Sequence, residues 1–258
     1  MNWIDSHTHL YVQEFEADFD EVIQRATMNG VSPLLLPNID LPSFELMMRK
    51  CQAHPGLLYP MIGLHPCDVK EDFMHMLEIL ESKFIPGIFC AVGETGIDLH
   101  WDRSTFEIQK ESFLVQIQWA KKWDLPLVIH SRASTAEIIE LLLPHIDGKL
   151  SGVFHCFSGT WEHAQQIIEM KNFKFGIGGS ITYKNNPLRS FLSQIPLEYI
   201  ILETDSPYLP PTPHRGKRNE SSYLPIIGDQ VATIYETPID EIARITTINS
   251  KTLFNLSS

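Results

Sequence analysis

The sequence predicts a single α/β domain folded as a (β/α)8 TIM barrel. Two observations lead to this fold class. Eight apolar runs alternate with longer amphipathic stretches, which is the pattern of βαβ units and a parallel sheet. The length of 258 residues also fits one such barrel, which takes roughly 250 residues. We therefore expect residues 1–258 to form one domain, with any active site at the carboxyl ends of the strands.

The predicted strands are near-continuous apolar runs, as expected for parallel strands that are buried on both faces. Eight strands of this kind favour a closed barrel over an open, doubly wound sheet. In chain order they are Asn2–Ser6, Val31–Pro37, Leu57–Leu64, Ile88–Gly93, Leu125–His130, Leu150–His155, Asn172–Ile177 and Tyr199–Glu203.

The stretches between the strands repeat apolar residues at helical spacing. In the first of them, Gly30 is a stop signal. The predicted helices are Glu16–Gly30, Ser43–His54, Asp72–Phe84, Thr105–Trp123, Ser134–His145, Trp161–Lys171, Pro187–Gln194, Ser222–Tyr235 and Pro238–Leu253.

Composition predicts an ordinary globular protein of the cytoplasm. The chain is 43% hydrophobic and 20% charged, and no apolar stretch reaches the ~18 residues of a membrane span. The first strand begins too early to leave room for a targeting peptide. Four cysteines without a C-x-x-C pairing fit reduced thiols. No membrane and no obligate protein partner is therefore expected.

The net charge of −12 argues against a large general affinity for nucleic acid, because Lys and Arg hold phosphates. A small basic surface at the entrance of an active site remains compatible with this net charge. Bound divalent ions would also attract a phosphate locally, whatever the charge of the outer surface.

Six imidazole or carboxylate side chains stand at the ends of predicted strands. Residues two apart in a strand point to the same side, so His7 and His9 can aim at one point. A barrel would bring all strand ends to one rim, and these six would meet there. The candidate metal ligands are His7, His9, Glu94, His130, His155 and Asp205.

Each candidate ligand has a simpler explanation when it is considered alone. His130 and His155 could be hydrogen-bonded structural residues, Glu94 could cap the next segment, and Asp205 could belong to a turn before Pro207. Packing does not explain all of them together, because buried charge without a partner is costly. The set therefore favours a metal site.

Six ligands exceed the three protein ligands of a typical catalytic zinc ion. Two divalent ions bridged by Glu94 fit the number better, with Asp205 placed to accept the proton of a metal-bound water. The donor set suits Zn, Mg, Mn or Ni and does not choose among them. Cys156 follows a ligand, so its side chain is expected on the opposite side of the strand in a packing role.

Substrate contacts are expected from three other residues. His65 ends the third strand, where it could donate to a phosphate or pack within the rim. Arg132 and Arg215 are candidates for bidentate phosphate contact, and Arg215 lies in the most basic stretch of the chain. Tyr183 and Phe157 could offer a stacking face to a base, although packing explains both more simply.

Over nearly its whole length the chain resembles the TatD-type metal-dependent deoxyribonucleases of the amidohydrolase superfamily. The resemblance implies a barrel with a two-metal centre that hydrolyses DNA phosphodiesters, often from the 3′ end of single strands. In that family, as here at Glu94, a glutamate stands where many amidohydrolases place a modified lysine. The matching motifs are Asp5-Ser6-His7-Thr8-His9, Gly63-Leu64-His65-Pro66, Gly93-Glu94-Thr95-Gly96-Ile97-Asp98, His130-Ser131-Arg132, His155-Cys156-Phe157-Ser158-Gly159, Gly178-Gly179-Ser180-Ile181-Thr182, Glu203-Thr204-Asp205-Ser206-Pro207-Tyr208-Leu209 and Pro213-His214-Arg215-Gly216-Lys217-Arg218-Asn219-Glu220.

The chain departs from the family pattern at two places. Ala133-Ser134 follow Arg132 where the family has an acidic residue and alanine, and Ser221 stands where the family has proline. Neither position is a proposed ligand. The departures therefore bear on substrate contacts near those loops more than on the chemistry.

Two other functions remain compatible with the sequence. One is a small-molecule amidohydrolase, such as a lactonase or deacylase, because one fold hosts many reactions. The acidic surface favours it slightly. The other is a catalytically idle binding protein that metal stabilises, which the complete ligand set disfavours.

Overall fold

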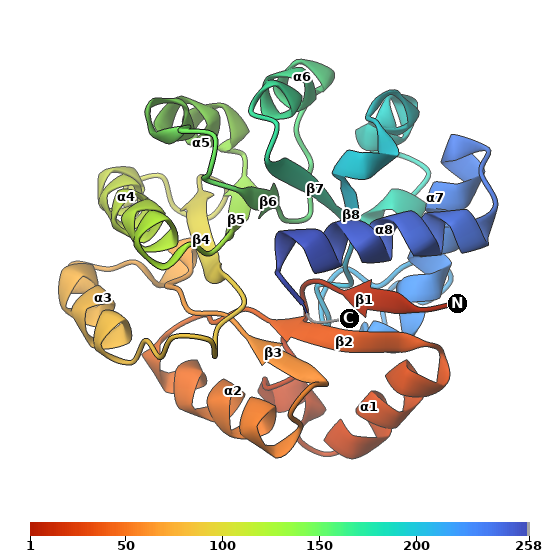
Figure 1. Cartoon of the computed structure of the whole chain (residues 1–258), viewed down its shortest axis with the longest axis horizontal. Coiled ribbons are helices and arrows are strands. Elements are labelled where there is room, and N and C mark those ends of the chain that lie inside the picture. The colour runs from red at the N-terminus through yellow and green to blue at the C-terminus, as the bar shows by residue number, and fades with distance from the viewer. Residues whose placement is uncertain (257–258) are drawn as a thin grey trace.

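A barrel of short parallel strands lies at the centre of the molecule, with the helices around it (Figure 1). The computed structural model describes residues 1–256. Within them, strands and helices follow one another in the predicted order up to the end of the seventh strand. The strands are β1 (Trp3–Asp5), β2 (Val31–Leu36), β3 (Leu58–Pro60), β4 (Val92–Asp98), β5 (Leu127–Arg132), β6 (Gly152–Phe154), β7 (Phe173–Ile177) and β8 (Ile200–Leu202).

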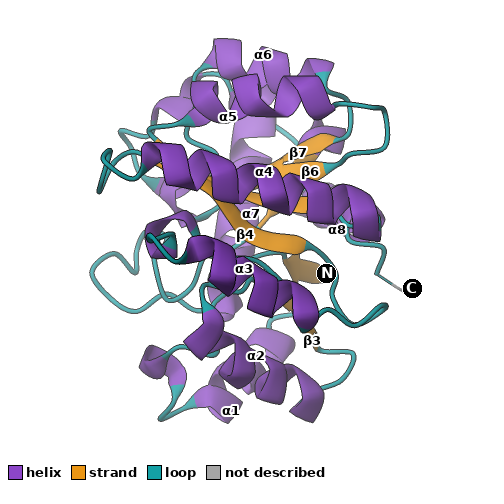
Figure 2. Cartoon of the chain, turned by 90° about the vertical axis from the view of Figure 1, so that its left-hand side faces the viewer, coloured by secondary structure: helices purple, strands orange, loops and turns teal. Residues whose placement is uncertain are grey.

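The helices form an outer layer around the strands, as the side view also shows (Figure 2). Each buries one face, which is the expected use of an amphipathic helix. They are α1 (Phe19–Met28), α2 (Leu41–Ala53), α3 (Phe73–Ser82), α4 (Phe106–Trp123), α5 (Thr135–Leu142), α6 (Trp161–Glu169), α7 (Leu224–Tyr235) and α8 (Ile239–Leu253).

The α-helix predicted over Pro187–Gln194 is absent, because this segment forms two single turns of 3-10 helix, Pro187–Ser190 and Leu192–Gln194. Phe191 separates them, because its φ of −137° and ψ of −1° are not helical. Two further 3-10 turns, Gly179–Thr182 and Leu197–Tyr199, complete the connection between β7 and β8. The connection is therefore compact without an α-helix.

Backbone hydrogen bonds close the barrel between its two ladders, which are β1–β3 and β4–β8. Beyond β3, Ile62 N–H donates to Ala91 O over 3.1 Å and Gly93 N–H donates to Ile62 O over 2.9 Å. Beyond β1, Ser6 N–H donates to Leu202 O over 3.2 Å. All strand pairs are parallel, so their carboxyl ends share one rim.

A buried carboxylate strengthens the seam between β1 and β8. Asp5 Oδ1 accepts from Thr204 N–H over 2.9 Å, and its Oδ2 accepts from Thr204 Oγ1 over 2.6 Å. Burial raises the pKa of Asp5 to about 7, against the hydrogen bonds from Thr204, which lower it. Asp5, the last residue of β1, is thereby fixed to Thr204, which follows β8 and precedes Asp205.

The interior of the barrel is a separate apolar cluster. Residues that adjoin its members along the strands, such as Leu34, Leu36 and Ile129, belong instead to the larger cluster, which also contains the helix residues. The two clusters therefore lie on opposite sides of the strands. Leu253, the last residue of α8, and Phe254 and Leu256, which follow it, belong to the same interior cluster. The interior set is Ile4, Leu35, Met61, Cys90, Ala91, Val128, Val153 and Ile201.

Alternation along the strands places a polar layer directly above this apolar one. Val128 and Val153 face the interior, so His130 and His155, two residues further, face the same way. The apolar layer therefore lies beneath the candidate site, and the polar side chains lie at the carboxyl ends of the strands.

The predicted bounds of the fourth strand, Ile88–Gly93, were wrong. The strand runs from Val92 to Asp98 and pairs with β5 as far as Asp98 and Arg132. Its polar residues are buried together with its apolar ones, so an apolar run could not mark its end. Glu94 therefore lies inside the strand.

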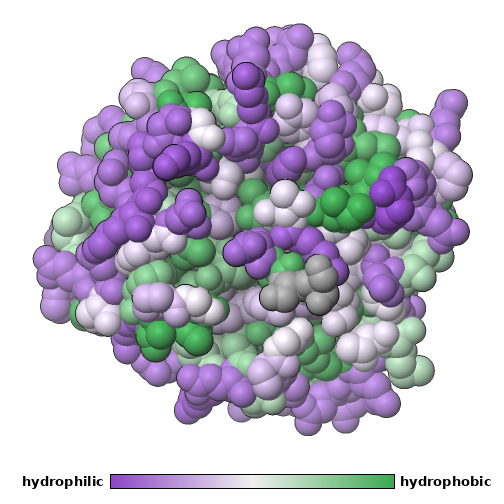
Figure 3. Space-filling model, viewed as in Figure 1, coloured by the Kyte–Doolittle hydropathy of each residue, from purple (hydrophilic) through white to green (hydrophobic). Residues whose placement is uncertain are grey.

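None of the helices within residues 1–256 combines the length and apolar character that crossing a bilayer requires. On the face shown in Figure 3, hydrophilic residues are spread widely and hydrophobic ones are interspersed among them.

Candidate metal centre

The carboxylate of Glu94 lies at the centre of the polar layer, where its two oxygens face two different groups of side chains. Glu94 is 2% exposed. Its Oε2 faces the histidine pair that follows β1, and its Oε1 faces a histidine after β3, one within β5 and one after β6. The structure thus brings together the ends of strands that are far apart in the sequence.

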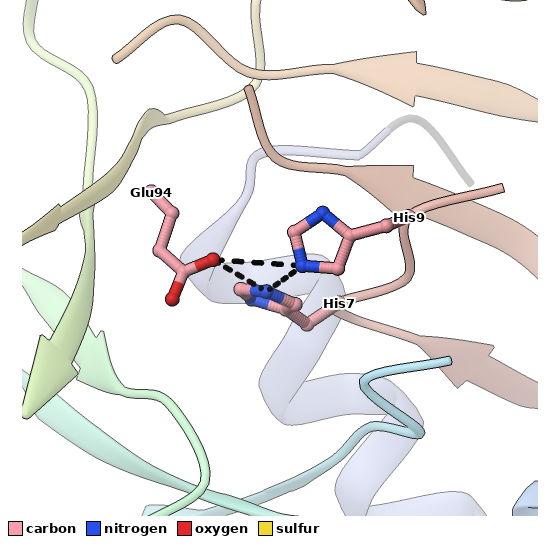
Figure 4. Close-up of side chains that lie close together, drawn as sticks. All are labelled: His7, His9 and Glu94. Atoms are coloured by element: carbon pink, nitrogen blue, oxygen red, sulfur yellow. Dashed lines mark hydrogen bonds and ion pairs between the residues drawn. The ribbon is translucent and has the colours of Figure 1, made fainter. Parts of the chain in front are cut away.

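The first group contains the His7–His9 pair (Figure 4). Glu94 Oε2 lies 3.1 Å from His7 Nε2 and 3.6 Å from His9 Nε2, and the two nitrogens are 3.2 Å apart. Asp205 Oδ1 is 3.5 Å from His9 Nε2 and 3.9 Å from His7 Nε2. With ligand bonds of about 2.0–2.2 Å, the donor atoms of one ion stand roughly 3–3.6 Å apart. The group is compatible with metal binding.

The second group gathers around the other oxygen of Glu94. Its Oε1 lies 2.8 Å from His130 Nδ1, 3.4 Å from His65 Nε2 and 3.9 Å from His155 Nε2. His65 Nε2 and His130 Nδ1 are 3.3 Å apart. His65 was predicted as a substrate contact, and the structure places it among the possible ligands.

Two carboxylates outside these groups contact two of the histidines. Asp98 Oδ2 lies 2.9 Å from His130 Nε2, and Glu203 Oε1 lies 2.9 Å from His155 Nδ1. An ionised carboxylate only accepts hydrogen bonds, so His130 Nε2 donates to Asp98 Oδ2. With its proton on Nε2, His130 would offer Nδ1 to a metal ion, whereas Glu203 and His155 form an ion-pair contact without hydrogen-bond geometry.

A tyrosine fixes the His9 imidazole in a similar way. Tyr11 donates its hydroxyl proton to Pro37 O over 2.6 Å, and His9 Nδ1 lies 3.1 Å from the same oxygen. With its only proton engaged, the hydroxyl can act toward His9 only as an acceptor. His9 therefore carries its proton on Nδ1 and presents the lone pair of Nε2 to Glu94.

Replacing Tyr11 with phenylalanine is expected to weaken divalent-metal binding about ten-fold, the lower end of the effect of removing such an outer partner. The ring still fills its buried place, but nothing selects the tautomer of His9. Metal affinity is measured by competition with a chelating dye.

Tyr235→Phe is the matched control, because the Tyr235 hydroxyl lies 2.7 and 2.8 Å from two acceptors, Leu192 O and Ile195 O, away from the candidate ligands. We expect it to leave metal affinity unchanged. Equal metal affinities for Tyr11→Phe and the wild type would show that Tyr11 does not orient His9.

The electrostatic surroundings keep both site carboxylates ionised. Burial by itself would raise the pKa of Glu94, but His65, His7 and His155 hold it well below its usual value. Burial alone would also raise the pKa of Asp205, but the neighbouring histidines outweigh burial and lower that pKa below its usual value. Imidazole and ionised carboxylate together form a suitable donor set for a divalent ion.

Glu203 reaches His155 only because residue 176 of β7 is glycine. A Cβ at Gly176 would collide with the Glu203 carboxylate. We expect Gly176→Ala to lower the free energy of unfolding by about 1–3 kcal/mol, a typical cost of overpacking. Chemical denaturation measures it, and an unchanged midpoint would contradict this packing argument.

The predicted arginines lie apart from the two groups. Arg132 and Arg215 are exposed, and their guanidinium carbons lie 5.2 Å from the Trp101 ring centroid and 4.4 Å from that of Tyr183. Among residues 1–256, neither arginine forms an ion pair. Both keep donors free for an anion. Phe157 is buried, which leaves it no face for a base.

The predicted orientation of Cys156 was wrong. Its sulfur lies within 4.8 Å of ligand atoms of His155 and Asp205. Alternation holds as far as His155 and fails at Cys156, because the positive φ of 43° at Cys156 takes the chain out of the extended conformation. Burial raises the pKa of its thiol, which favours the neutral form.

Tyr11 and Asp98, which bond to candidate ligands, and Glu203, which contacts His155, were not predicted from the sequence. Alternation could have indicated Tyr11, which stands two residues after His9 as His9 stands two after His7. Asp98 ends the motif that contains Glu94, four residues further along the same strand. No comparable signal linked Glu203 to His155.

Comparison with known proteins finds relatives over nearly the whole chain. The model of a family described as "TatD related DNase" matches residues 4–255. The "Uncharacterized metal-dependent hydrolase YabD" of Bacillus subtilis (strain 168) is 36% identical, covering 98% of this chain and 99% of that protein. The "3'-5' ssDNA/RNA exonuclease TatD" of Pantoea vagans (strain C9-1) is 30% identical, covering 98% and 99%.

A solved structure has the same fold. The crystal structure of YjjV, a TatD homologue from Escherichia coli K12, superposes with a TM-score of 0.89 at 30% identity, covering 99% of this chain and 98% of that one. The predicted TIM barrel is thereby confirmed. The chain belongs to the TatD-related DNase family and is a metal-dependent hydrolase.

Proposed function

We propose that the chain is a two-metal deoxyribonuclease that hydrolyses DNA phosphodiester bonds, beginning at the ends of single strands. The observation that carries the proposal is the division of donor groups between the two oxygens of Glu94. Oε2 lies beside His7 and His9, which Asp205 also approaches, and Oε1 lies beside His130. A carboxylate that faces two donor groups is suited to bridge two cations.

His7, His9 and Asp205 would hold one ion, and His130 and His155 the other, with Glu94 shared. His65 supplies a further nitrogen beside the second group and either holds the ion or donates to a phosphate. When bound, two divalent ions neutralise the charge that builds on the attacking and leaving oxygens of a displacement at phosphorus. The donor set accepts Zn, Mg, Mn or Ni.

Asp205 is the proposed general base. Its Oδ1 lies 3.5 Å from His9 Nε2 and 3.8 Å from His155 Nε2, between the two donor groups. Its lowered pKa keeps it ionised near neutral pH. From this place it can accept a proton from the water that attacks phosphorus.

DNA as the substrate class rests on the family and on the arginines. One relative is named an exonuclease of single-stranded DNA and RNA. Arg132 and Arg215 stand exposed without ion pairs among residues 1–256, so phosphates can reach their donors. We propose that residues 1–258 act as one hydrolase domain, as the family match over residues 4–255 supports.

The test is digestion of oligonucleotides labelled at the 3′ or the 5′ end, single- and double-stranded, by protein that has been stripped with a chelator. Each divalent metal is then added back separately. We expect no digestion without metal and stepwise loss of nucleotides from a single-strand end after addition. Turnover of carbonyl substrates without cleavage of DNA would instead assign a small-molecule amidohydrolase.

A further inference from the structure

We propose that Trp101 and Arg132 form a subsite for one nucleotide beside the metal centre, in which the base stacks on the indole and the guanidinium binds a phosphate. This inference rests on the proposed nucleic-acid function and names residues that would hold the substrate. Trp101 lies in the connection between β4 and α4, and Arg132 is the last residue of β5.

Trp101 is the most solvent-exposed of the large hydrophobic side chains near the rim, with 71% of its surface accessible. Trp3 and Trp119, by contrast, are buried in the core. Its ring meets the His100 ring edge-to-face, with the centroids 5.0 Å apart, and most of the Trp101 indole stays open to solvent. An accessible aromatic face is what nucleic-acid-binding proteins offer to unpaired bases, whatever their sequence.

The loop that carries Trp101 is fixed to the metal centre through Asp98. The Oδ1 of Asp98 accepts from His100 N–H over 2.8 Å and from Trp101 N–H over 3.1 Å. Its Oδ2 lies 2.9 Å from His130 Nε2. One carboxylate thus positions both a candidate metal ligand and the backbone of the exposed tryptophan.

Arg132 lies where β5 pairs with the end of β4, the strand that leads into the Trp101 loop. Its carbonyl accepts from Leu99 N–H over 3.0 Å, and it stands two residues beyond His130. In a strand this spacing keeps the side chain on the same side and moves it roughly 6.6 Å further out. The arginine is therefore aimed at the mouth of the barrel, above the metal centre.

The two side chains already lie together. The Arg132 guanidinium carbon is 5.2 Å from the centroid of the Trp101 ring, which is within range of a cation–π contact. This contact leaves the N–H donors at the edge of the guanidinium available, and the indole keeps most of its surface open. A nucleotide matches both side chains, because its base can stack on the indole and its phosphate can bind the guanidinium.

The acidic residue that follows is occupied elsewhere. Asp102 Oδ1 accepts from Ser104 N–H over 2.8 Å and from Ser104 Oγ over 2.7 Å, and among residues 1–256 it forms no ion pair with Arg132. The guanidinium charge therefore stays available, despite the net charge of −12.

The experiment measures binding of a dye-labelled single-stranded oligonucleotide by fluorescence anisotropy, with chelator present so that nothing is cleaved. A second oligonucleotide lacks the base of its terminal nucleotide. We expect Trp101→Leu to weaken binding of the intact strand about ten-fold, within the range for loss of one stacked base. Trp101→Tyr is expected to restore most of it, since an aromatic face returns.

The abasic strand separates stacking from general damage. We expect it to bind the wild type about as weakly as the intact strand binds Trp101→Leu, and to respond little to that substitution. Arg132→Gln is expected to reduce the slope of log affinity against log salt by about 0.7, the value for one phosphate contact on a single strand. Met28→Ala, a change at a 78%-exposed side chain at the end of α1, is the control and should match the wild type.

Equal affinity of Trp101→Leu and the wild type for the intact strand would overturn the subsite, as would the absence of any binding by the wild type. The proposed nuclease function is judged separately, by digestion after metal is added. Failure to digest DNA despite a tryptophan-dependent affinity would remove the function and leave the nucleotide subsite standing.

Discussion

Substituting alanine for Glu94 is expected to reduce hydrolysis by roughly three orders of magnitude or more, because metal ions supply several kcal/mol of transition-state stabilisation. Its two oxygens face separate donor groups, so no other described side chain replaces it. The metal content should fall in the same variant. Elemental analysis after dialysis and initial rates on a single-stranded oligonucleotide measure the two effects.

Glu94→Gln provides a closer comparison, because it keeps the size of the side chain and removes the negative charge. Glu140→Ala, at an exposed position of α5, is the control for loss of a carboxylate at the surface. It should retain both metal and rate. A Glu94→Ala protein with the metal stoichiometry and rate of the wild type would remove the basis of the two-metal proposal.

The sequence predicted the parts of the fold that follow from periodicity. Val128 and His130 stand two residues apart on β5, and His155 stands two residues after Val153, just beyond the end of β6. Alternation alone is enough to place such histidines above the apolar interior. Convergence at one rim then follows from parallel strands in a closed barrel.

Polar residues inside strands were harder to predict. Seven consecutive residues of β4 are buried, including Glu94 and Asp98, because the site at the strand end supplies polar partners in place of solvent. An apolar run cannot reveal this pattern, so the predicted strand stopped at Gly93. The seam contact between Asp5 and Thr204 depends on closure of the barrel and has no local signal.

The residues that contact the candidate ligands show a second limit. Each acts through one specific distance, such as the 2.9 Å between Glu203 Oε1 and His155 Nδ1. Glu203 and His155 are 48 positions apart, and they meet only because β7 between them carries Gly176, where a side chain would collide with that carboxylate. Such a contact is a product of packing across three strands.

Asp205→Asn is expected to lower kcat by about 10²–10⁴-fold at saturating metal, the usual range for loss of a general base. Asparagine keeps the shape and can still offer an oxygen to an ion, but it cannot accept the proton of the attacking water. KM should change far less, since Asp205 lies among the histidines rather than beside the exposed arginines. Steady-state rates at several metal concentrations separate the two parameters.

The metal titration also distinguishes a base from a ligand. If Asp205 served only to hold an ion, excess metal would restore the rate of Asp205→Asn, whereas loss of the base persists at every metal concentration. Asp229→Asn, on the exposed side of α7, controls for the change of charge and should behave as the wild type. A rate within two-fold of the wild type, or full recovery with metal, would transfer the role of base to another group. His65 is the neighbour to test next, because its Nε2 lies 3.4 Å from Glu94 Oε1.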